Sequence, residues 1–523
     1  MKKLLLLGLG GLCAFTAGAQ NAEPYVMNTD IAVNMSANGN YVVLQDYFSN
    51  VTIFNTYTKA LDFIQEAYPG NGNCVANNGI VVGQDIYETS VGTIFKGGQS
   101  VVPSQLKAMN LSSIDGITPD GSRACGYISN DGATYVVPCY FDLDENSNIV
   151  SINVLPYPEK DFLGSRPQFG TAVWISDDGR TIAGQIVDAT GFYTYPAVYK
   201  QGDNGEWTCI TPSYSLFNPD DAPLPTFPEF EDCEPVVTDF MTPNNKARYE
   251  EALKEYQTSG GIDPNQNLAE YMTDEEMEAF NQAIEEYATD PLAYYYSLID
   301  KYWTALNQAT KGSSFALGSM TLNPQGTILA SPLASSDDES VSDNFTGFEL
   351  VVFDLEANNF KKIQAPNYGL IPKQILEDGT IICLDYFTNC DFVLLPDADS
   401  VITLEEFLGQ THPTWVPWMQ ENLDVTMVPT PNGRVDMVKA GFITFSRDCA
   451  IMAGGYQGDD DTFSYIFGLE NAGVEGIEAD LTDGRIVVFD LMGCKVLDSK
   501  NVDDLNSLPA GLYIINGKKV MIK

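Results

Sequence analysis

The sequence predicts a mainly β protein: a β-propeller of about seven blades, with an inserted α-helical subdomain and a small C-terminal β-sandwich. Three observations support this prediction. A short phrase typical of a β-hairpin recurs along the chain, the hydrophobic period changes in one long interval, and the composition changes again after Asn471. The chain has 523 residues, which is long enough to bury a large core in two or three structural units.

The clearest copy of the recurring phrase is VWISDDGRTIAGQIV, at residues 173–187. Apolar runs with β-branched residues flank a Ser-Asp-Asp-Gly turn, in which Asp and Gly tolerate the backbone angles of a tight hairpin. Turn geometry alone explains this Asp and this Gly, so neither is assigned a functional role.

Six further copies of the phrase are expected. Their turn positions are Gly39, Gly79, Gly121, Gly326, Gly379 and Cys449, the last of which replaces the glycine. Most intervals between copies are about 40 to 70 residues and contain further strand-like runs, which indicates propeller blades rather than a helical solenoid. We therefore expect the propeller to occupy residues 20–470.

The longest interval, between Gly179 and Gly326, predicts helices. Residues 218–239 are rich in proline and acid and predict an irregular loop. Apolar residues then recur every three to four positions, as on one face of a helix. The signals for the three helices are Pro243 with Gly260, a capping box at Thr273 and Glu276, and Asp290-Pro291 with Gly312. We expect residues 240–312 to form a helical insertion within the propeller.

Residues 1–19 are predicted to be a secretory signal peptide. A basic start, an apolar stretch and the sequence Ala-Gly-Ala at 17–19 fit its three parts. We expect cleavage after Ala19. The bulky Leu12 before Cys13 is unsuited to lipid attachment, and no other run is apolar and long enough for a membrane helix. The chain is therefore expected to be secreted or displayed at the cell surface, without membrane insertion.

The net charge of −44 excludes two classes of partner. So negative a chain repels nucleic acid and anionic membrane surfaces. We expect no cofactor, and weak binding of calcium is the one exception that the acidic surface allows. The segment 142–148 has oxygen side chains at alternate positions, as calcium loops do, but it lacks their glycine and final glutamate, and we interpret it as a hairpin turn.

The cysteines are scattered, and most of them lie in apolar strand-like runs. We interpret them mainly as free, buried side chains. Cys383 and Cys390 are the best disulfide candidates, because they could face each other across a hairpin. The sequence contains no Cys-x-x-Cys pair, which disfavours a structural zinc site.

The sequence assigns no catalytic residue and no metal ligand. The single histidine, His412, disfavours mechanisms that need a histidine base, and the many acids give no indication of which carboxylates could act as a pair. Trp415 and Trp418, near His412 and Tyr456, form a candidate aromatic platform for a sugar or a peptide. The alternative for these four residues is packing in the core.

Part of the chain resembles a known family of extracellular repeats. A Leu-rich helical piece, a Trp and an I-S-x-D-G-x-x-I-x-G hairpin are similar to the repeats named for their His-Ala-Phe (HAF) motif, which occur in secreted and surface proteins of bacteria. Residues 173–187 match best, and 35–43 and 117–128 match more loosely. The resemblance covers about residues 32–468 and implies a propeller-like fold, and the family fixes no catalytic residue.

The C-terminal part, 474–523, resembles the type A sorting domains of type IX secretion substrates. The matching stretches are VFDL at 488–491, Gly493, Lys495-Val496, LPAGLY at 508–513 and GKKV at 517–520. Cys494 stands where Arg is usual, and the opening Pro-Asn-Pro is absent. The resemblance implies a small β-sandwich, recognition by the outer-membrane export machinery, and a Gram-negative bacterium as the source.

We therefore expect a non-enzymatic binding protein, secreted or at the cell surface, whose propeller loops present a site for an extracellular glycan or protein. One alternative is an extracellular carbohydrate-active hydrolase that uses paired carboxylates in the central funnel. Another is a structural surface or adhesin component without a small ligand. Carboxylates clustered at the funnel would favour the hydrolase, and an aromatic-lined face would favour binding.

Overall fold

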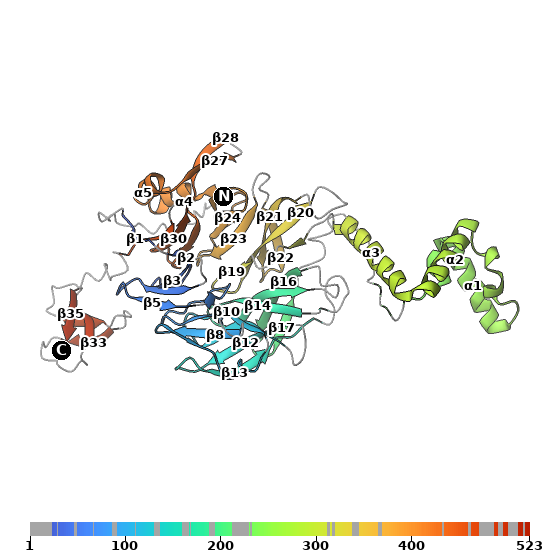
Figure 1. Ribbon diagram of the computed structural model, residues 1–523, viewed down its shortest axis with the longest axis horizontal. Coiled ribbons are helices and arrows are strands. Elements are labelled where there is room, and N and C mark those ends of the chain that lie inside the picture. Colours follow the sequence, from blue (N-terminus) through green and yellow to red (C-terminus); the bar gives the residue numbers. More distant parts are fainter. Residues whose placement is uncertain are drawn as a thin grey trace, which may run out of the picture.

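The computed structural model describes residues 23–469, with gaps, and four strands between residues 486 and 522 (Figure 1). The gaps in the first span are 29, 47–49, 66, 86–90, 110, 130–135, 159–166, 168, 188–193, 212–227, 229, 231–232, 311–313, 316–319, 337–344, 364–368, 431–432 and 459–461. The expected signal peptide, 1–19, lies outside the described residues. No helix among the described residues is long and apolar enough to cross a membrane.

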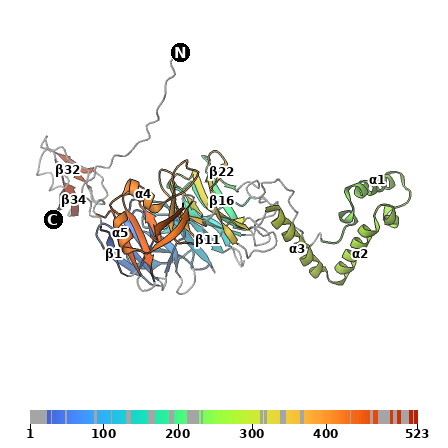
Figure 2. The same cartoon turned by 90° about the horizontal axis from the view of Figure 1, so that it is seen from above.

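The predicted mainly β fold is confirmed. Within the described part of the chain, seven antiparallel sheets follow one another along the sequence and surround one centre (Figures 1 and 2). Most have four strands, paired in chain order from the inside to the outside. Four-stranded antiparallel sheets arranged around one centre are characteristic of a β-propeller.

We number these sheets 1 to 7. Sheet 1 contains β2 (Ile31–Met35), β3 (Tyr41–Gln45), β4 (Val51–Asn55) and β5 (Leu61–Ile64). Sheet 2 contains β6 (Ala67–Pro69), β7 (Val81–Asp85), β8 (Val91–Lys96) and β9 (Gln99–Val101). Sheet 3 contains β10 (Ser112–Ile117), β11 (Arg123–Ser129), β12 (Val136–Leu143) and β13 (Ile149–Val154). Sheet 4 contains β14 (Phe169–Ile175), β15 (Thr181–Val187), β16 (Thr194–Gln201) and β17 (Trp207–Ile210).

Sheet 5 contains β18 (Ser314–Phe315), β19 (Thr321–Leu322), β20 (Ile328–Ser336), β21 (Phe345–Asp354) and β22 (Asn359–Ile363). Sheet 6 contains β23 (Leu370–Ile375), β24 (Ile381–Asp385), β25 (Asp391–Leu394) and β26 (Ile402–Thr403). Sheet 7 contains β29 (Phe442–Phe445), β30 (Met452–Gln457) and β31 (Thr462–Phe467). Its outer strand is β1 (Tyr25–Met27), from the other end of the chain, and Tyr25 pairs with Ile466.

The seven predicted turns are present. Each lies just before the second strand of its sheet, and its glycine, or Cys449 in sheet 7, has a left-handed φ between 57° and 91°. In each turn this residue donates its N–H to the carbonyl three positions earlier, as Gly179 does to Ser176 at 3.0 Å. In the turn of sheet 4, the Asp178 carboxylate accepts a hydrogen bond from the Arg180 N–H at 2.9 Å. This turn aspartate therefore supports the turn itself, as the sequence indicated.

Apolar side chains between neighbouring sheets form the core. One cluster joins sheets 1 to 3 and includes Val43, Phe95 and Phe141, and another joins sheets 3 to 5. The β-branched and aromatic residues of the strands alternate between these inter-sheet layers, which is why the sequence shows strand-like runs at each blade.

Three helices lie between β17 and β18, where the hydrophobic period changes. They are α1 (Pro243–Ser259), α2 (Asp274–Thr289) and α3 (Pro291–Thr310), with short 3-10 helices at Val237–Phe240 and Pro264–Glu270. The expected signals of α1 and α2 are present: Gly260 ends α1 with a φ of 74°, and Thr273 and Glu276 form the capping box of α2. Gly312, expected to end the third helix, lies outside the described residues. Met241, Tyr249 and Met272 make a small core of their own. In Figures 1 and 2, α1 and α2 lie away from the sheets.

A second long connection joins sheet 6 to sheet 7. It contains α4 (Leu404–Thr411), α5 (Val416–Asn422) and a hairpin of β27 (Val425–Thr430) and β28 (Gly433–Val438). In an antiparallel sheet of four strands, sheet-to-sheet connections leave from the end opposite the first turn. Both long connections therefore leave the ring at the end opposite the seven turns.

The C-terminal strands form a separate antiparallel sheet in the order β33-β32-β34-β35. Their bounds are β32 (Ile486–Phe489), β33 (Lys495–Ser499), β34 (Gly511–Ile515) and β35 (Lys518–Ile522). The stretch LPAG at 508–511, which carries part of the resemblance to sorting domains, lies mostly outside the described residues.

The disulfide proposed between Cys383 and Cys390 is wrong. Both thiols are free and buried. The register of β24 and β25 places Cys383 opposite Phe392, and the hairpin backbone pairs Cys390 with Asp385 through an N–H···O bond of 2.8 Å. The two cysteines therefore do not face each other across the hairpin.

Candidate functional site: the central cavity

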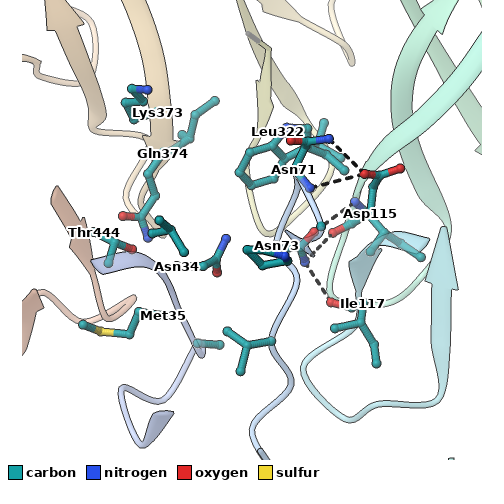
Figure 3. Close-up of a pocket in the computed structure, with 18 of the residues that line it drawn as sticks. Asn34, Met35, Asn71, Asn73, Asp115, Ile117, Leu322, Lys373, Gln374 and Thr444 are labelled. Carbon is teal, nitrogen blue, oxygen red and sulfur yellow. Dashed lines mark hydrogen bonds between the residues drawn. The ribbon is translucent and has the colours of Figure 1, made fainter. Parts of the chain in front are cut away.

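A cavity of about 530 Å³ lies at the centre of the ring. The inner strands of all seven sheets, with β19 as that strand in sheet 5, contribute side chains to it: Asn34, Tyr68, Asp115, Trp174, Leu322, Gln374 and Thr444. Figure 3 labels Asn34, Asp115, Leu322, Gln374 and Thr444. Its volume is in the range of small-molecule sites, and it combines aromatic rings with converging polar groups. This is the candidate functional site.

The segment 70–73, with the sequence Gly-Asn-Gly-Asn, follows β6 and runs beside β10. Gly72 donates its N–H to the Asp115 carbonyl at 3.0 Å, and Asn73 accepts from the Ile117 N–H at 2.9 Å. A Cβ added to Gly72 would lie 1.9 Å from the Val173 carbonyl oxygen. Only glycine allows this close approach of the backbones, so the segment forms part of the cavity wall.

Asp115 is the only acidic residue among the described residues that line the cavity. It is 1% exposed, and its Oδ1 accepts from the Asn71 backbone N–H at 3.3 Å and from the Asn71 side chain at 3.1 Å. Its Oδ2 has no hydrogen-bond partner among the described residues. Burial raises the pKa of Asp115 to about 6, although Asn71 and the nearby Ser113 hydroxyl act in the opposite direction.

Side-chain amides join the first strands of neighbouring sheets. Asn73 donates to the carbonyls of Ile117 at 2.9 Å and Ile175 at 3.1 Å, which links sheets 3 and 4. Gln374 donates to the Phe445 carbonyl at 2.8 Å and accepts from the Phe445 N–H at 2.9 Å, which links sheets 6 and 7. These amides provide hydrogen bonds where the inner strands of different sheets do not pair, so they stabilise the wall rather than point to a ligand.

Lys373 of β23 lies on the wall opposite Asp115 (Figure 3). Its Nζ is 5.2 Å from the centre of the Phe442 ring. No carboxylate among the described residues lies within ion-pair distance of this amine. Burial lowers the pKa of Lys373, and the charge of Asp391 partly opposes that change.

An ion pair crosses the turn end of the cavity. Arg447 and Asp177 lie in the turns of sheets 7 and 4, and both guanidinium terminal nitrogens contact the Asp177 carboxylate. The neighbouring turns are joined by backbone hydrogen bonds, such as Arg447 N–H to the Ala37 carbonyl at 3.1 Å. Burial lowers the pKa of Arg447 to about 10, so the guanidinium remains charged at neutral pH. This pair narrows the cavity at one end.

The four residues expected to form an aromatic platform lie together, but away from the cavity. Trp415 is 2% exposed and stacks on His412, with ring centres 3.9 Å apart, and on Phe467 at 5.1 Å. Trp418 and Tyr456 are half-buried against the same core. Because His412 and Trp415 are buried, they present no exposed face, and their arrangement matches core packing. Burial lowers the pKa of His412 to about 4.

No group of three or more His, Cys, Asp or Glu side chains in the described part of the chain is arranged to hold a metal ion. In the segment 142–148, the Asp144 carboxylate accepts the N–H groups of Asn146 at 2.9 Å and Asn148 at 2.8 Å. The segment connects β12 to β13. It is the hairpin turn that we expected.

Sequence reasoning missed Asp115, Lys373 and segment 70–73. The alternation of Gly and Asn after Pro69 was the available signal for the segment, and by itself it predicts a turn. Nothing in the local sequence distinguishes Asp115 from the other acids, because the cavity is built from strands hundreds of residues apart.

The fold and the cavity define the class of protein: a ring of β-sheets with a central site. No family model matches the sequence, and no curated protein matches it. Among solved structures, the chain is similar to TolB from Acinetobacter baumannii, with 9% identity over 72% of this chain and 61% of that one, and a TM-score of 0.31.

The chain is also similar to the β-propeller domain of the Trilobed protease from Pyrococcus furiosus, with 9% identity over 85% of this chain and 93% of that one, and a TM-score of 0.38. A prolyl endopeptidase gives 9% identity over 82% of this chain, a TM-score of 0.36, and coverage of 45% of its own length. The chain thus spans less than two thirds of the TolB protein and of the endopeptidase. The strand pairing within this chain defines its fold.

Proposed function

We propose that the protein is a non-enzymatic binding protein, secreted or at the cell surface, whose ligand occupies the central cavity. The scaffold in this proposal is a closed seven-bladed propeller over residues 20–470, with residues 240–312 as a helical insertion. The ligand is an extracellular glycan or a segment of a protein. The observation that carries the proposal is the cavity itself, to which all seven sheets contribute polar and aromatic side chains.

The composition of the cavity wall favours binding over hydrolysis. A glycoside hydrolase of the usual kind needs two carboxyl groups, about 5 to 9.5 Å apart. Asp115 is the single carboxylate among the described residues that line the cavity, and its nearest polar partners are the amides of Asn71. Tyr68, Trp174 and Phe442 add ring surfaces of the kind that bind sugars and peptides.

Delivery to the surface is proposed to depend on the two ends of the chain. Residues 1–19 would direct export and be removed after Ala19, and residues 474–523 would be recognised by the export machinery of a Gram-negative bacterium. Deleting residues 484–523 is expected to abolish surface delivery without loss of the folded ring. Unchanged delivery of this deletion variant would count against the sorting role.

The test of ligand binding is a glycan array combined with a peptide pool, applied to the wild-type protein and to two variants. Ile371 lines the cavity near the start of β23, at the end opposite the turns, so Ile371→Trp is expected to obstruct it. Ile210 lies on the outer strand of sheet 4 and is 37% exposed, so Ile210→Trp is the matched control.

We expect Ile371→Trp to abolish binding and Ile210→Trp to retain it. Equal binding by both variants would place the ligand outside the cavity and contradict the proposal. Blank results with both the array and the peptide pool would remove its support as well.

A further inference from the structure

Two side chains of opposite charge face each other across the cavity. Asp115 lies on β10 of sheet 3 and Lys373 on β23 of sheet 6, and Figure 3 shows them on opposite walls with Asn34 between them. They do not form an ion pair with each other. Among the described residues, the buried Asp115 Oδ2 has no hydrogen-bond partner, although the Ser113 hydroxyl acts on the same carboxyl group, and the Lys373 amine has no carboxylate within ion-pair distance.

The excess of acidic residues in the chain makes the lack of an ion pair at Lys373, within the described part of the chain, notable. Acidic residues outnumber basic ones by 71 to 27, yet Lys373 forms no ion pair among the described residues, and the buried Asp391 acts on its pKa from beyond ion-pair distance. A half-buried ammonium and a buried carboxylate are both costly when they are unpaired, and a ligand that pairs with both would recover that cost.

The two charges together restrict the ligand. Lys373 would attract a purely anionic ligand, but Asp115 would repel it. Asp115 would attract a purely cationic ligand, but Lys373 would repel it. A ligand with a cationic group at one end and an anionic group at the other suits both walls. The ammonium and carboxylate of a peptide with free ends have this chemistry.

The shape of the cavity limits the length of such a ligand. The Arg447–Asp177 ion pair crosses the turn end, so an extended chain cannot pass straight through the ring. Both ends of the ligand must therefore lie inside a volume of about 530 Å³ or towards the end opposite the turns. A peptide of about two or three residues fits this range of volumes.

We propose that the central cavity binds short peptides with free ends, with the ligand ammonium at Asp115 and the ligand carboxylate at Lys373. This inference rests on the proposed function, because it names the ligand class of the same cavity. Asn34 lies between the two charges and Thr444 on the Lys373 side of the cavity, and both supply polar contacts to the peptide backbone.

The test uses the full mature chain and four mixed pools of tripeptides: free, N-acetylated, C-amidated and capped at both ends. Bound peptides are quantified by equilibrium dialysis and mass spectrometry. We expect each cap to weaken binding at least about tenfold, which corresponds to the loss of one charged contact.

Two variants test which residue contacts which end of the peptide. Asp115→Asn is expected to bind the free pool about tenfold more weakly and to lose its discrimination against the N-acetylated pool. Lys373→Met is expected to lose its discrimination against the C-amidated pool in the same way. Lys361 and Asp399 form an exposed ion pair outside the cavity, so Lys361→Met and Asp399→Asn are matched controls that should bind as the wild-type protein does. Near-ultraviolet circular dichroism and a thermal melt establish that each variant is folded.

The outcomes separate this inference from the proposed function. Equal binding of free and fully capped pools, or unchanged discrimination in both cavity variants, would overturn the inference. Binding of a glycan that Ile371→Trp blocks, without binding of any peptide, would overturn the inference and leave the proposed function standing. Absence of all binding would overturn both.

Discussion

Arg447 and Asp177 occupy the same position in two copies of the turn and form an ion pair across the ring, although 270 residues separate them in the sequence. They belong to sheets 7 and 4, which lie across the centre from each other. The pair therefore joins two halves of the ring that have no shared strand pairing. Its contacts involve both oxygens of the carboxylate, which is the arrangement that fixes geometry most strongly.

Breaking this pair is expected to destabilise the ring. Arg447→Met leaves the Asp177 carboxylate without its partner and should lower the free energy of unfolding by about 1 to 2 kcal/mol. Urea unfolding monitored by fluorescence measures the change. Arg180→Met, which breaks the exposed Arg180–Asp203 pair, is the control and should have no measurable effect. The double exchange Arg447→Asp with Asp177→Arg should restore part of the loss, and no restoration would show that the pairing itself is unimportant.

His412 is expected to make stability depend on pH. Burial lowers its pKa to about 4, whereas an unfolded chain has a value near 6.5. As the pH falls below about 6.5, the unfolded chain takes up the proton first, so stability present at neutral pH is lost progressively towards pH 4. The loss amounts to at most about 3 kcal/mol.

The variant His412→Gln should have a flatter dependence of the unfolding free energy between pH 6.5 and 4 than the wild-type protein. Because the chain has one histidine, proton NMR can follow its titration directly. A measured His412 pKa near 6.5 in the folded protein would contradict this prediction.

Asp391 is expected to have the opposite effect to His412 on the pH dependence of stability, because it lowers stability as the pH rises. It is fully buried, neither carboxylate oxygen has a hydrogen-bond partner among the described residues, and burial raises its pKa well above the usual value. Lys373 and Glu405 face it, and they lower and raise its pKa respectively. As the pH rises from about 4, the unfolded chain loses its proton first, so Asp391 costs stability increasingly at higher pH.

We therefore expect Asp391→Asn to be more stable than the wild-type protein at pH 8, with the difference closing towards pH 4. Urea unfolding at pH 4, 6 and 8 tests this, and the exposed Asp399→Asn serves as the control. A variant that is less stable than the wild-type protein at every pH would show that the Asp391 carboxylate has a native partner.

The turn of sheet 7 is expected to gain stability from a glycine. Cys449 has a φ of 57°, a conformation that costs an ordinary residue about 1 kcal/mol and a glycine almost nothing. Cys449→Gly should raise the melting temperature. Gly326→Ala should lower it, because the added Cβ would lie 2.5 Å from the Thr181 Cβ. Opposite shifts in thermal melts would contradict the turn assignment.

The elements that could be predicted from sequence are those specified by a few residues close together in the chain. The turn at Gly179 is specified by four neighbouring residues, and the capping box of α2 by Thr273 and Glu276, so both could be read directly. The Cys383–Cys390 disulfide was wrong because the register of the hairpin is set by side chains on both strands and not by the spacing of the cysteines.

The candidate site could not be predicted, because no short stretch of sequence specifies it. Asp115 and Lys373 meet across a cavity because sheets 3 and 6 face each other in the ring, a relationship that no short stretch of sequence contains. The aromatic residues near His412 were conspicuous in the sequence, but rings at such spacing also fill cores, as Trp415 does against Phe467.

Strand β1 has a consequence for the order in which the molecule can be completed. Tyr25, Val26 and Met27 are among the first residues of the ring to be synthesised, yet their partners on β31 are among the last. During synthesis and export, sheet 7 consists of β29 and β30 alone until residues 462–467 have emerged, because β31 is missing and β1 has no partner. The earlier sheets therefore stay an open arc until then. A chain interrupted before residue 462 would carry six whole sheets and still expose an unpaired strand edge at each end, which is a recognisable target for chaperones and proteases.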